Sequence, residues 1–288
     1  MPKNYWIVGA STGIGRALAL ALLARGDRVV VSARSRERLL EIAAEAGVDA
    51  DIGPYTGEGA HANAGPHGAT SYQAKTESAP GQRALGAACT VVPCDVTNAQ
   101  SVAGAFAAAS AALGKIDVAV LNAGTYTPAS DADISVDSYR QVFDVNVLGV
   151  VRLLEHLVPA MQASGGGHIA MTSSLTGYIG LPHAAAYSAT KAALISMAES
   201  LHSELAPSGI RVTVINPGFV DTPLTDRNDF PMPFLISPTA AAEAIVRGLD
   251  AGRFEVRFPW QMALIMRALR LLPYGLYFRL ARRLVRHA

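Results

Sequence analysis

Half of the 288 residues are hydrophobic, which is enough to bury one large core, so we expect a single domain. The formal net charge of +1 gives no reason to expect a nucleic acid partner. Cys89 and Cys94 would lie about 16 Å apart along a strand, too far for a disulfide. The apolar run from Tyr5 to Ala10 leaves no room for a signal peptide before it, so we expect a cytoplasmic protein with free thiols.

Short apolar runs alternate with helical patterns along the chain. We predict strands at residues 5–8, 28–32, 90–92, 116–121, 168–172, 210–215 and 254–258. Near-continuous apolar strands separated by amphipathic segments are typical of a parallel sheet covered on both faces. The predicted fold class is therefore α/β, with one Rossmann-like, doubly wound sheet of about seven strands. Ligands of such sheets bind beyond the carboxyl ends of the strands.

Two regions interrupt this alternation. Residues 47–88 are rich in Gly, Ala, Pro, Ser and His and are much longer than an ordinary helix-to-strand connection. We interpret them as an insertion into a Rossmann-fold domain of residues 1–259. The insertion could be a simple surface excursion, or a lid or partner-binding loop.

Residues 260–288 are predicted to form a basic, apolar helical extension that Pro273 divides into two helices. The first would be about 20 Å long, too short to cross a hydrocarbon core of about 30 Å. The extension could cover the protein's own substrate cleft or a subunit interface, or it could make peripheral contact with a membrane. Its arginines are Arg267, Arg270, Arg279, Arg282, Arg283 and Arg286.

A glycine-rich turn follows the first predicted strand. Its spacing is Gly-x-x-x-Gly-x-Gly, and it leads into a helical stretch. Glycines at such a turn let backbone N–H groups and a helix N-terminus approach a pyrophosphate. The turn therefore predicts a dinucleotide site that includes Gly9, Ser11, Thr12, Gly13, Ile14 and Gly15.

The end of the second strand distinguishes the two nicotinamide cofactors. An NAD site carries an acidic residue there, whereas an arginine accommodates a 2′-phosphate. Here the strand is followed by Ala33 and Arg34, with no carboxylate. We therefore predict NADP(H), with Arg34 at the 2′-phosphate. The alternative is that Arg34 is an ordinary solvated residue.

Further candidate cofactor residues follow the later strands in chain order. Those after the third and fourth strands could reach the adenine end of the cofactor, and those after the sixth could meet the nicotinamide carboxamide. They are Asp95 and Val96, then Asn122, Ala123 and Gly124, and finally Pro217, Gly218, Val220 and Thr222.

Tyr187 and Lys191 would lie one helical turn apart if the segment after Ala185 is a helix. A free tyrosine has a pKa of about 10, and a nearby ammonium favours the phenolate. Ser174, upstream of both, could hold a carbonyl oxygen, with Ser173 as its nearest rival. A proton donor, a cation and a hydroxyl are the parts of a ketone reductase.

These motifs together resemble the short-chain dehydrogenase/reductase family over about residues 4–258. The resemblance implies that Tyr187 is the general acid or base and that Lys191 lowers its pKa and holds the nicotinamide ribose. It implies that Ser174 orients the carbonyl and that Asn146 anchors a water linking Lys191 to solvent. It also implies a homodimer or homotetramer. The matching residues are Gly9, Gly13, Gly15, Asp95, Asn122, Ala123, Gly124, Asn146, Ser174, Tyr187, Lys191, Pro217, Gly218 and Thr222.

We therefore expect an NADPH-dependent oxidoreductase that transfers hydride to a ketone or aldehyde, reversibly with the alcohol, and that uses no metal. The apolar tail indicates a hydrophobic substrate, and it resembles the tails of bacterial family members of undefined substrate and, more loosely, of lipid-ketone reductases. The alternative is a non-catalytic NADP(H)-binding sensor or scaffold. The complete set of Ser, Tyr, Lys and Asn argues against it, because a sensor needs no proton donor.

Overall fold

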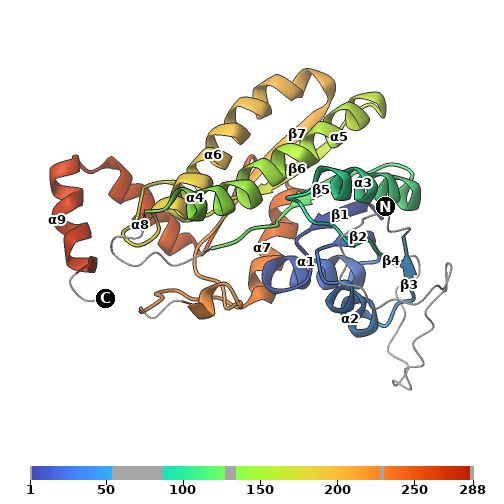
Figure 1. Cartoon of the computed structure of the whole chain (residues 1–288), viewed down its shortest axis with the longest axis horizontal. Helices are drawn as coiled ribbons and strands as arrows, with labels where there is room; N and C mark the ends of the chain where they lie inside the picture. The colour runs from blue at the N-terminus through green and yellow to red at the C-terminus, as the bar shows by residue number, and fades with distance from the viewer. Residues whose placement is uncertain (1, 54–86, 127–133, 228–229, 286–288) are drawn as a thin grey trace.

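A computed structural model describes residues 2–53, 87–126, 134–227 and 230–285 of the protein, with side chains up to residue 282 (Figure 1). Within these residues, eight parallel strands form one sheet in the order β3-β4-β2-β1-β5-β6-β7-β8. The chain crosses over next to β1, whose neighbours are β2 on one side and β5 on the other. Such a reversal is the switch point at which doubly wound sheets bind ligands. The predicted fold class is confirmed.

All seven predicted strands are present, and the structure adds an eighth, β3, which we missed. β3 pairs with β4 at the edge of the sheet, inside the segment that we interpreted as an insertion. Its three residues are too few to give a periodic signal. The rest of that segment, residues 54–86, lies outside the described residues. The strands are β1 (Asn4–Val8), β2 (Arg28–Ser32), β3 (Ala50–Ile52), β4 (Ala88–Val91), β5 (Val118–Leu121), β6 (Gly167–Thr172), β7 (Ile210–Pro217) and β8 (Glu255–Phe258).

Helices cover both faces of the sheet (Figure 1). On β1, Trp6 and Val8 point into the core on one face, while Tyr5 and Ile7 point into the core on the other. This alternation explains why the strand is apolar throughout. One face carries α1 (Gly13–Ala24), α2 (Arg36–Ala46) and α7 (Pro238–Asp250), and the other carries α3 (Ala99–Leu113), α4 (Val136–Phe143), α5 (Gly149–Ala163) and α6 (Ala185–Leu205).

Most of these helices begin at a side-chain cap. Ser35, Asn98, Ser135 and Ser237 accept hydrogen bonds from backbone N–H groups at the starts of α2, α3, α4 and α7. Thr12, at the start of α1, makes no such bond. The first N–H groups of α1 are therefore left for another partner.

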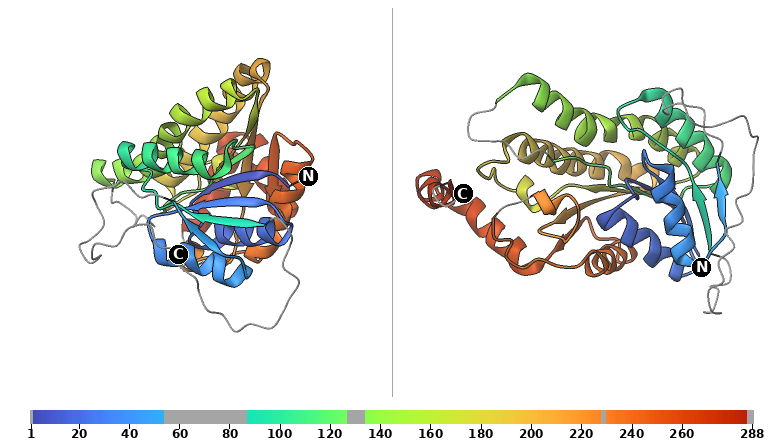
Figure 2. Two further views of the ribbon diagram at one scale, coloured as in Figure 1. Left: turned by 90° about the vertical axis from the view of Figure 1, so that its right-hand side faces the viewer. Right: turned by 60° about the horizontal axis from the view of Figure 1, so that its bottom comes forward.

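The C-terminal tail consists of α8 (Trp260–Leu271) and α9 (Tyr274–Val285), which extend away from the sheet (Figure 2). The tail packs through a small third core against the segment that follows β6, and this core contains Leu175, Ile179, Ala263, Met266, Tyr277 and Ala281. In the described part of the chain, no helix is long and apolar enough to cross a membrane.

Candidate active site

Tyr187 and Lys191 lie in the first turns of α6, where the predicted helix places them side by side. The Lys191 ammonium lies 5.4 Å from the centre of the Tyr187 ring. Its Nζ donates a hydrogen bond of 2.9 Å to the carbonyl of Thr172, at the end of β6. The Tyr187 ring also packs edge-on against Tyr126, with centroids 5.2 Å apart. The pair therefore sits at the carboxyl edge of the sheet, where we expected it.

Burial dominates the ionisation of both side chains. It raises the pKa of Tyr187 to about 12, although hydrogen bonding with Ser174 acts in the opposite direction. It lowers the pKa of Lys191 to about 8. Removing a charge from water disfavours the charged form of each group. In the chain by itself, burial therefore raises the pKa of Tyr187, which is opposite to the lowering that we expected from Lys191.

The two neighbouring serines at the end of β6 have different partners. Ser173 Oγ donates a 2.7 Å hydrogen bond to the carbonyl of Lys191 and so holds the backbone of α6. Ser174 Oγ makes longer bonds of 3.2 Å, donating to the Pro217 carbonyl and accepting from the Thr176 N–H. The weaker bonds leave the Ser174 hydroxyl easier to redirect toward a ligand than that of Ser173.

Asn146 lies in a π-helical turn, Asp144–Leu148, between α4 and α5, and is fully buried. Its Oδ1 accepts from the Thr125 N–H at 2.7 Å, and its Nδ2 donates to the Thr125 carbonyl at 3.0 Å. Nδ2 also donates to Thr190 Oγ1, which in turn donates to the carbonyl of Tyr187. Asn146 therefore connects the segment after β5 to the helix that carries Tyr187.

Gly124 lies between these groups. A Cβ at this position would stand 3.5 Å from Asn146 Oδ1 and 3.6 Å from Lys191 Nζ. Nearby, the buried Thr172 Oγ1 finds no hydrogen-bond partner among the described residues. We had not predicted Thr125, Thr172 or Thr190. Only Thr190 gives a sequence signal, because it lies three residues after Tyr187 on the same helical face.

The glycine turn after β1 packs closely against the end of β5. Gly9 has a φ of +92°, and a Cβ there would lie 2.4 Å from the backbone N of Ala123. A Cβ on Gly15 would lie 2.2 Å from the carbonyl oxygen of Gly9. Asn122 Nδ2 donates to that same oxygen at 2.9 Å. The glycines therefore allow the turn to close, and they bring the start of α1 to the switch point.

The segment after β7 lies over this turn. A Cβ on Gly13 would lie 2.8 Å from Cγ2 of Thr222. Val220 pairs with Ile236 in an isolated parallel bridge, and Gly218 N–H donates to the Phe258 carbonyl at 2.7 Å. Residues 217–222 and the N-terminus of α1 thus face one another. They form two sides of a site at the start of α1, where Thr12 provides no side-chain cap, and such a helix start fits the phosphates of a dinucleotide.

The remaining candidates border this site. Arg34, two residues after the end of β2, is exposed and makes no ion pair with the described residues. Asp95 Oδ1 accepts from the N–H and hydroxyl of Thr97, at 2.9 and 2.7 Å, so its carboxylate stabilises the turn before α3. Val96 is buried, and its carbonyl accepts from Arg152 at 3.0 Å. The structure therefore brings all the candidate residues to the carboxyl edge of the sheet.

Sequence reasoning missed a polar cluster that joins the site to the tail. Glu255 of β8 accepts hydrogen bonds from Tyr178, Asn216, Arg257 and Arg267. Although burial acts in the opposite direction, the bonds from Tyr178, Arg257 and Asn216 hold the pKa of this carboxyl below its usual value. The cluster links α8 to the segment that begins at Ser174. No sequence pattern predicts it, because its members come from four elements.

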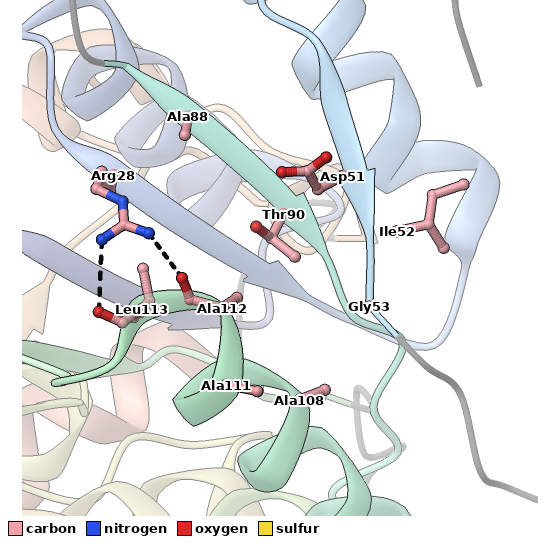
Figure 3. Close-up of a pocket in the computed structure, with 10 residues that line it drawn as sticks. All are labelled: Arg28, Asp51, Ile52, Gly53, Ala88, Thr90, Ala108, Ala111, Ala112 and Leu113. Carbon is pink, nitrogen blue, oxygen red and sulfur yellow. Dashed lines mark hydrogen bonds between the residues drawn. The ribbon is translucent and has the colours of Figure 1, made fainter. Parts of the chain in front are cut away.

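A separate hollow of about 310 Å³ lies at the edge of the sheet formed by β2, β4 and β3 (Figure 3). Arg28 lines the hollow, and its guanidinium group donates hydrogen bonds to the carbonyls of Ala112 and Leu113 at the end of α3. The other lining residues are Asp51, Ile52, Gly53, Ala88, Thr90, Ala108 and Ala111. None of them belongs to the candidate active site.

Known proteins match both the sequence and the fold. A family model described as short chain dehydrogenase matches residues 3–63 and 62–230. An uncharacterized oxidoreductase from Myxococcus xanthus is 35% identical over 278 residues, which cover 96% of each chain. A crystal structure of a short chain dehydrogenase from Burkholderia cenocepacia, in complex with NADP, is 27% identical, covers 97% of each chain and has a TM-score of 0.72.

A second solved structure differs in its cofactor. A 3-ketoacyl-(acyl-carrier-protein) reductase from Brucella melitensis, complexed with NADH, is 26% identical, with a TM-score of 0.68. The match covers 88% of this chain and 96% of that one. Similar structures thus contain either nicotinamide cofactor. Family model, relatives and fold agree: the chain belongs to the short-chain dehydrogenase family of oxidoreductases.

Proposed function

We propose that the protein is an NADP(H)-dependent reductase of a hydrophobic ketone or aldehyde, with Ser174, Tyr187, Lys191 and Asn146 as its catalytic set. The observation that carries the proposal is the convergence of the Ser174 hydroxyl, the Tyr187 phenol and the Lys191 ammonium beyond the end of β6. A bound nicotinamide cofactor would supply the hydride. The chain's own groups would bind the carbonyl and deliver the proton.

In this proposal, Tyr187 holds the proton on its phenol oxygen and donates it to the substrate oxygen as the alcohol forms. Ser174 exchanges its long bond with the Pro217 carbonyl for a bond to the same substrate oxygen, where negative charge develops. Lys191 stabilises the phenolate that remains, because an opposite charge nearby favours the ionised form. Asn146 and Thr190 position α6 and with it Tyr187.

The proposed cofactor site extends along the carboxyl edge of the sheet. The uncapped start of α1 would bind the pyrophosphate, and Arg34 would bind the 2′-phosphate. Asp95, Val96, Asn122, Ala123 and Gly124 would border the adenine half. The nicotinamide half would be held by Tyr187, Lys191, Pro217, Gly218, Val220 and Thr222, and the turn itself contributes Gly9, Ser11, Thr12, Gly13, Ile14 and Gly15.

Cofactor choice can be tested by binding. We expect NADPH to bind more tightly than NADH, since Arg34 has no competing ion pair with the described residues and no acidic residue lies between β2 and α2. Arg34→Ala should weaken NADPH binding and leave NADH binding nearly unchanged, measured by the fluorescence of the reduced cofactor. A clear preference of the native protein for NADH would contradict the assignment.

The catalytic assignment is tested by Tyr187→Phe, which keeps the ring and removes the proton. We expect turnover to fall at least about 100-fold, the usual contribution of a general acid. NADPH binding should stay nearly intact. The assay is NADPH oxidation over aliphatic, steroidal, sugar and long-chain ketones, with and without detergent. Retained turnover would contradict the role of Tyr187, and cofactor binding without turnover on any ketone would favour the sensor or scaffold.

Apolar side chains beyond β7 and on the tail support a hydrophobic substrate. The rings of Phe219 and Phe230 lie 6.0 Å apart, and Leu181 and Met262 flank the third core. We also propose a cytoplasmic homodimer or homotetramer. Light scattering at several protein concentrations would measure the assembly, and a monomer at all of them would contradict it.

A further inference from the structure

One face of the tail packs against the domain. Met266 and Tyr277 are buried against Leu175 and Ile179 in the third core. The Tyr277 hydroxyl donates to the carbonyl of Gly180, and Arg267 is paired with Glu255. The tail is therefore docked through one side. Its other side is not needed to hold it in place.

The outer face of the tail is apolar. On α8, Trp260, Leu264 and Leu271 are 68%, 61% and 85% exposed and share one face at spacings of four and eleven residues. On α9, the exposed rings of Tyr274 and Phe278 stack with centroids 5.6 Å apart. So many large apolar groups in contact with water are unusual for a soluble protein surface. They indicate that something covers this face.

The same segment is strongly basic. Residues 260–288 contain six arginines and no Asp or Glu, while the whole chain has a net charge of only +1. The rest of the chain is therefore net acidic. Arg270, Arg279 and Arg282 are exposed and form no ion pair with the described residues. The apolar face is thus accompanied by unpaired positive charge at one end of the molecule.

We propose that the exposed face of α8 and α9 binds an anionic membrane surface. Arginines beside apolar side chains complement acidic lipid headgroups above acyl chains. A second copy of the chain fits less well, because a two-fold contact would place this patch against itself and oppose like charges. Each helix is about 18 Å long, so it would lie in the interface without crossing it.

The proposed orientation places the active site at the lipid surface. The inner face of the tail contacts residues 175–181, which directly follow Ser174. The net acidic remainder of the chain would face away from the anionic surface. If the proposed function holds, a hydrophobic carbonyl compound could enter from the membrane. This last consequence rests on the proposed function, whereas membrane binding itself does not.

Trp260 offers a direct reporter of binding. The second tryptophan, Trp6, is fully buried and donates a hydrogen bond to Ser32, so added lipid should leave its emission unchanged. We expect phosphatidylcholine vesicles containing phosphatidylglycerol to shift Trp260 emission to shorter wavelength, and brominated lipid to quench it. Pure phosphatidylcholine should have much less effect. Trp260→Phe should abolish the signal while co-sedimentation with the anionic vesicles persists.

Variants that remove positive charge test whether vesicle binding depends on the arginines of the tail or on the net charge of the whole protein. Arg270→Gln/Arg282→Gln should weaken vesicle binding about 30-fold, which corresponds to about 1 kcal/mol for each arginine. The control, Arg140→Gln/Arg247→Gln, makes the same charge change at two exposed positions on α4 and α7 and should bind as the native protein does. Raising the salt concentration should weaken native binding, because exposed charges are screened.

Several outcomes would overturn the proposal. They are the absence of binding to anionic vesicles at low salt, equal binding to neutral vesicles, and equal losses in the two double variants. Self-association that the tail variant abolishes, without vesicle binding, would instead assign this face to a contact between copies. The measurement uses no substrate, so a failed reductase assay and a failed vesicle assay are distinguishable. Unchanged thermal denaturation of both double variants confirms that they are folded.

Discussion

The candidate active site and the C-terminal tail both depart from the usual pattern of polar side chains outside and apolar side chains inside. The candidate active site buries the polar Ser174 and Lys191, whereas the tail exposes the apolar Trp260 and Leu271. Buried polar groups cost free energy unless they are paired, and exposed apolar groups lose the benefit of burial. A chain tolerates such costs mainly where function requires them. Both regions are the ones at which we propose that another molecule binds.

The two regions are also in contact. Glu255 and Tyr178 connect α8 to the segment after Ser174, and Tyr277 of α9 bonds to the carbonyl of Gly180. A change in how the tail is docked would therefore reach the serine through only a few residues. Substitutions in each region should show whether a change in the tail affects the candidate active site.

The largest effect should come from Lys191→Met in the absence of cofactor. Burial lowers the pKa of Lys191 to about 8, so near neutral pH the folded chain bears the cost of a buried ammonium. We expect the variant to be more stable by about 3 kcal/mol at about pH 7, from 1.36 kcal/mol per pKa unit. Urea denaturation measures the difference.

The lowered pKa of Lys191 also determines how the stability of the folded protein changes with pH. Between about pH 8 and the ordinary lysine pKa, the unfolded chain binds more protons at this position than the folded one, so native stability rises with pH. The advantage of Lys191→Met should therefore shrink toward about pH 10. Above the ordinary tyrosine pKa, the raised pKa of Tyr187 should destabilise both proteins. If the difference in free energy of unfolding between Lys191→Met and the native protein did not change with pH, burial of a charged lysine would be contradicted.

Gly15→Ala should destabilise the cofactor turn. The added Cβ would lie 2.2 Å from the carbonyl oxygen of Gly9, and backbone cannot move aside as a flexible side chain can. We expect a loss of about 2 kcal/mol, typical of overpacking, and weaker NADPH binding. Thermal denaturation and a cofactor titration measure the two effects.

A glycine of the tail provides the matched control. Gly275 lies in α9 with nothing within 4 Å of a built Cβ, so Gly275→Ala should raise helix propensity by up to about 1 kcal/mol. NADPH binding should not change. If Gly15→Ala and Gly275→Ala lost the same stability, the loss in Gly15→Ala could not be attributed to the close packing of the cofactor turn.

Glu255→Gln should loosen the connection between the two regions. The substitution leaves Arg257 and Arg267 without their shared anion and should cost about 1.5 kcal/mol. The lowered pKa of Glu255 means that its contribution is present above the ordinary carboxyl pKa and is lost as pH falls through the folded value. Limited proteolysis of the tail and thermal denaturation at neutral and acidic pH measure both effects.

The control for this change is Glu243→Gln. Glu243 pairs with Arg247 on the exposed surface of α7, where such pairs contribute about 0.3–0.5 kcal/mol. If both variants lost the same small amount, the Glu255 cluster would be no more than a surface ion pair.

Of the four test substitutions, Tyr277→Phe should have the smallest effect. It removes one hydrogen bond to the Gly180 carbonyl and keeps the buried ring, at a cost of about 1 kcal/mol. Hydrogen exchange of residues 175–181 should increase, while vesicle binding stays as in the native protein. Tyr274→Phe, on the exposed side of α9, should leave exchange unchanged. Unaltered exchange in Tyr277→Phe would show that the tail does not restrain this segment.

Sequence alone determined the seven longer strands, because a buried parallel strand is apolar along its whole length. It also determined that Tyr187 and Lys191 share a helical face, since that relation depends only on helix geometry. The order of the motifs then predicted where they would meet. Their chemical roles in this protein remain predictions.

Only the tertiary structure decided how these groups are held. It separated Ser173, which bonds the backbone of α6, from Ser174, and it joined Asn146 to Thr125 and Thr190. It also brought Glu255 to Tyr178, 77 residues apart, and docked the tail through one face. These relations depend on which elements lie side by side. Periodicity and spacing describe one element at a time, so they carry no information about contacts between distant ones.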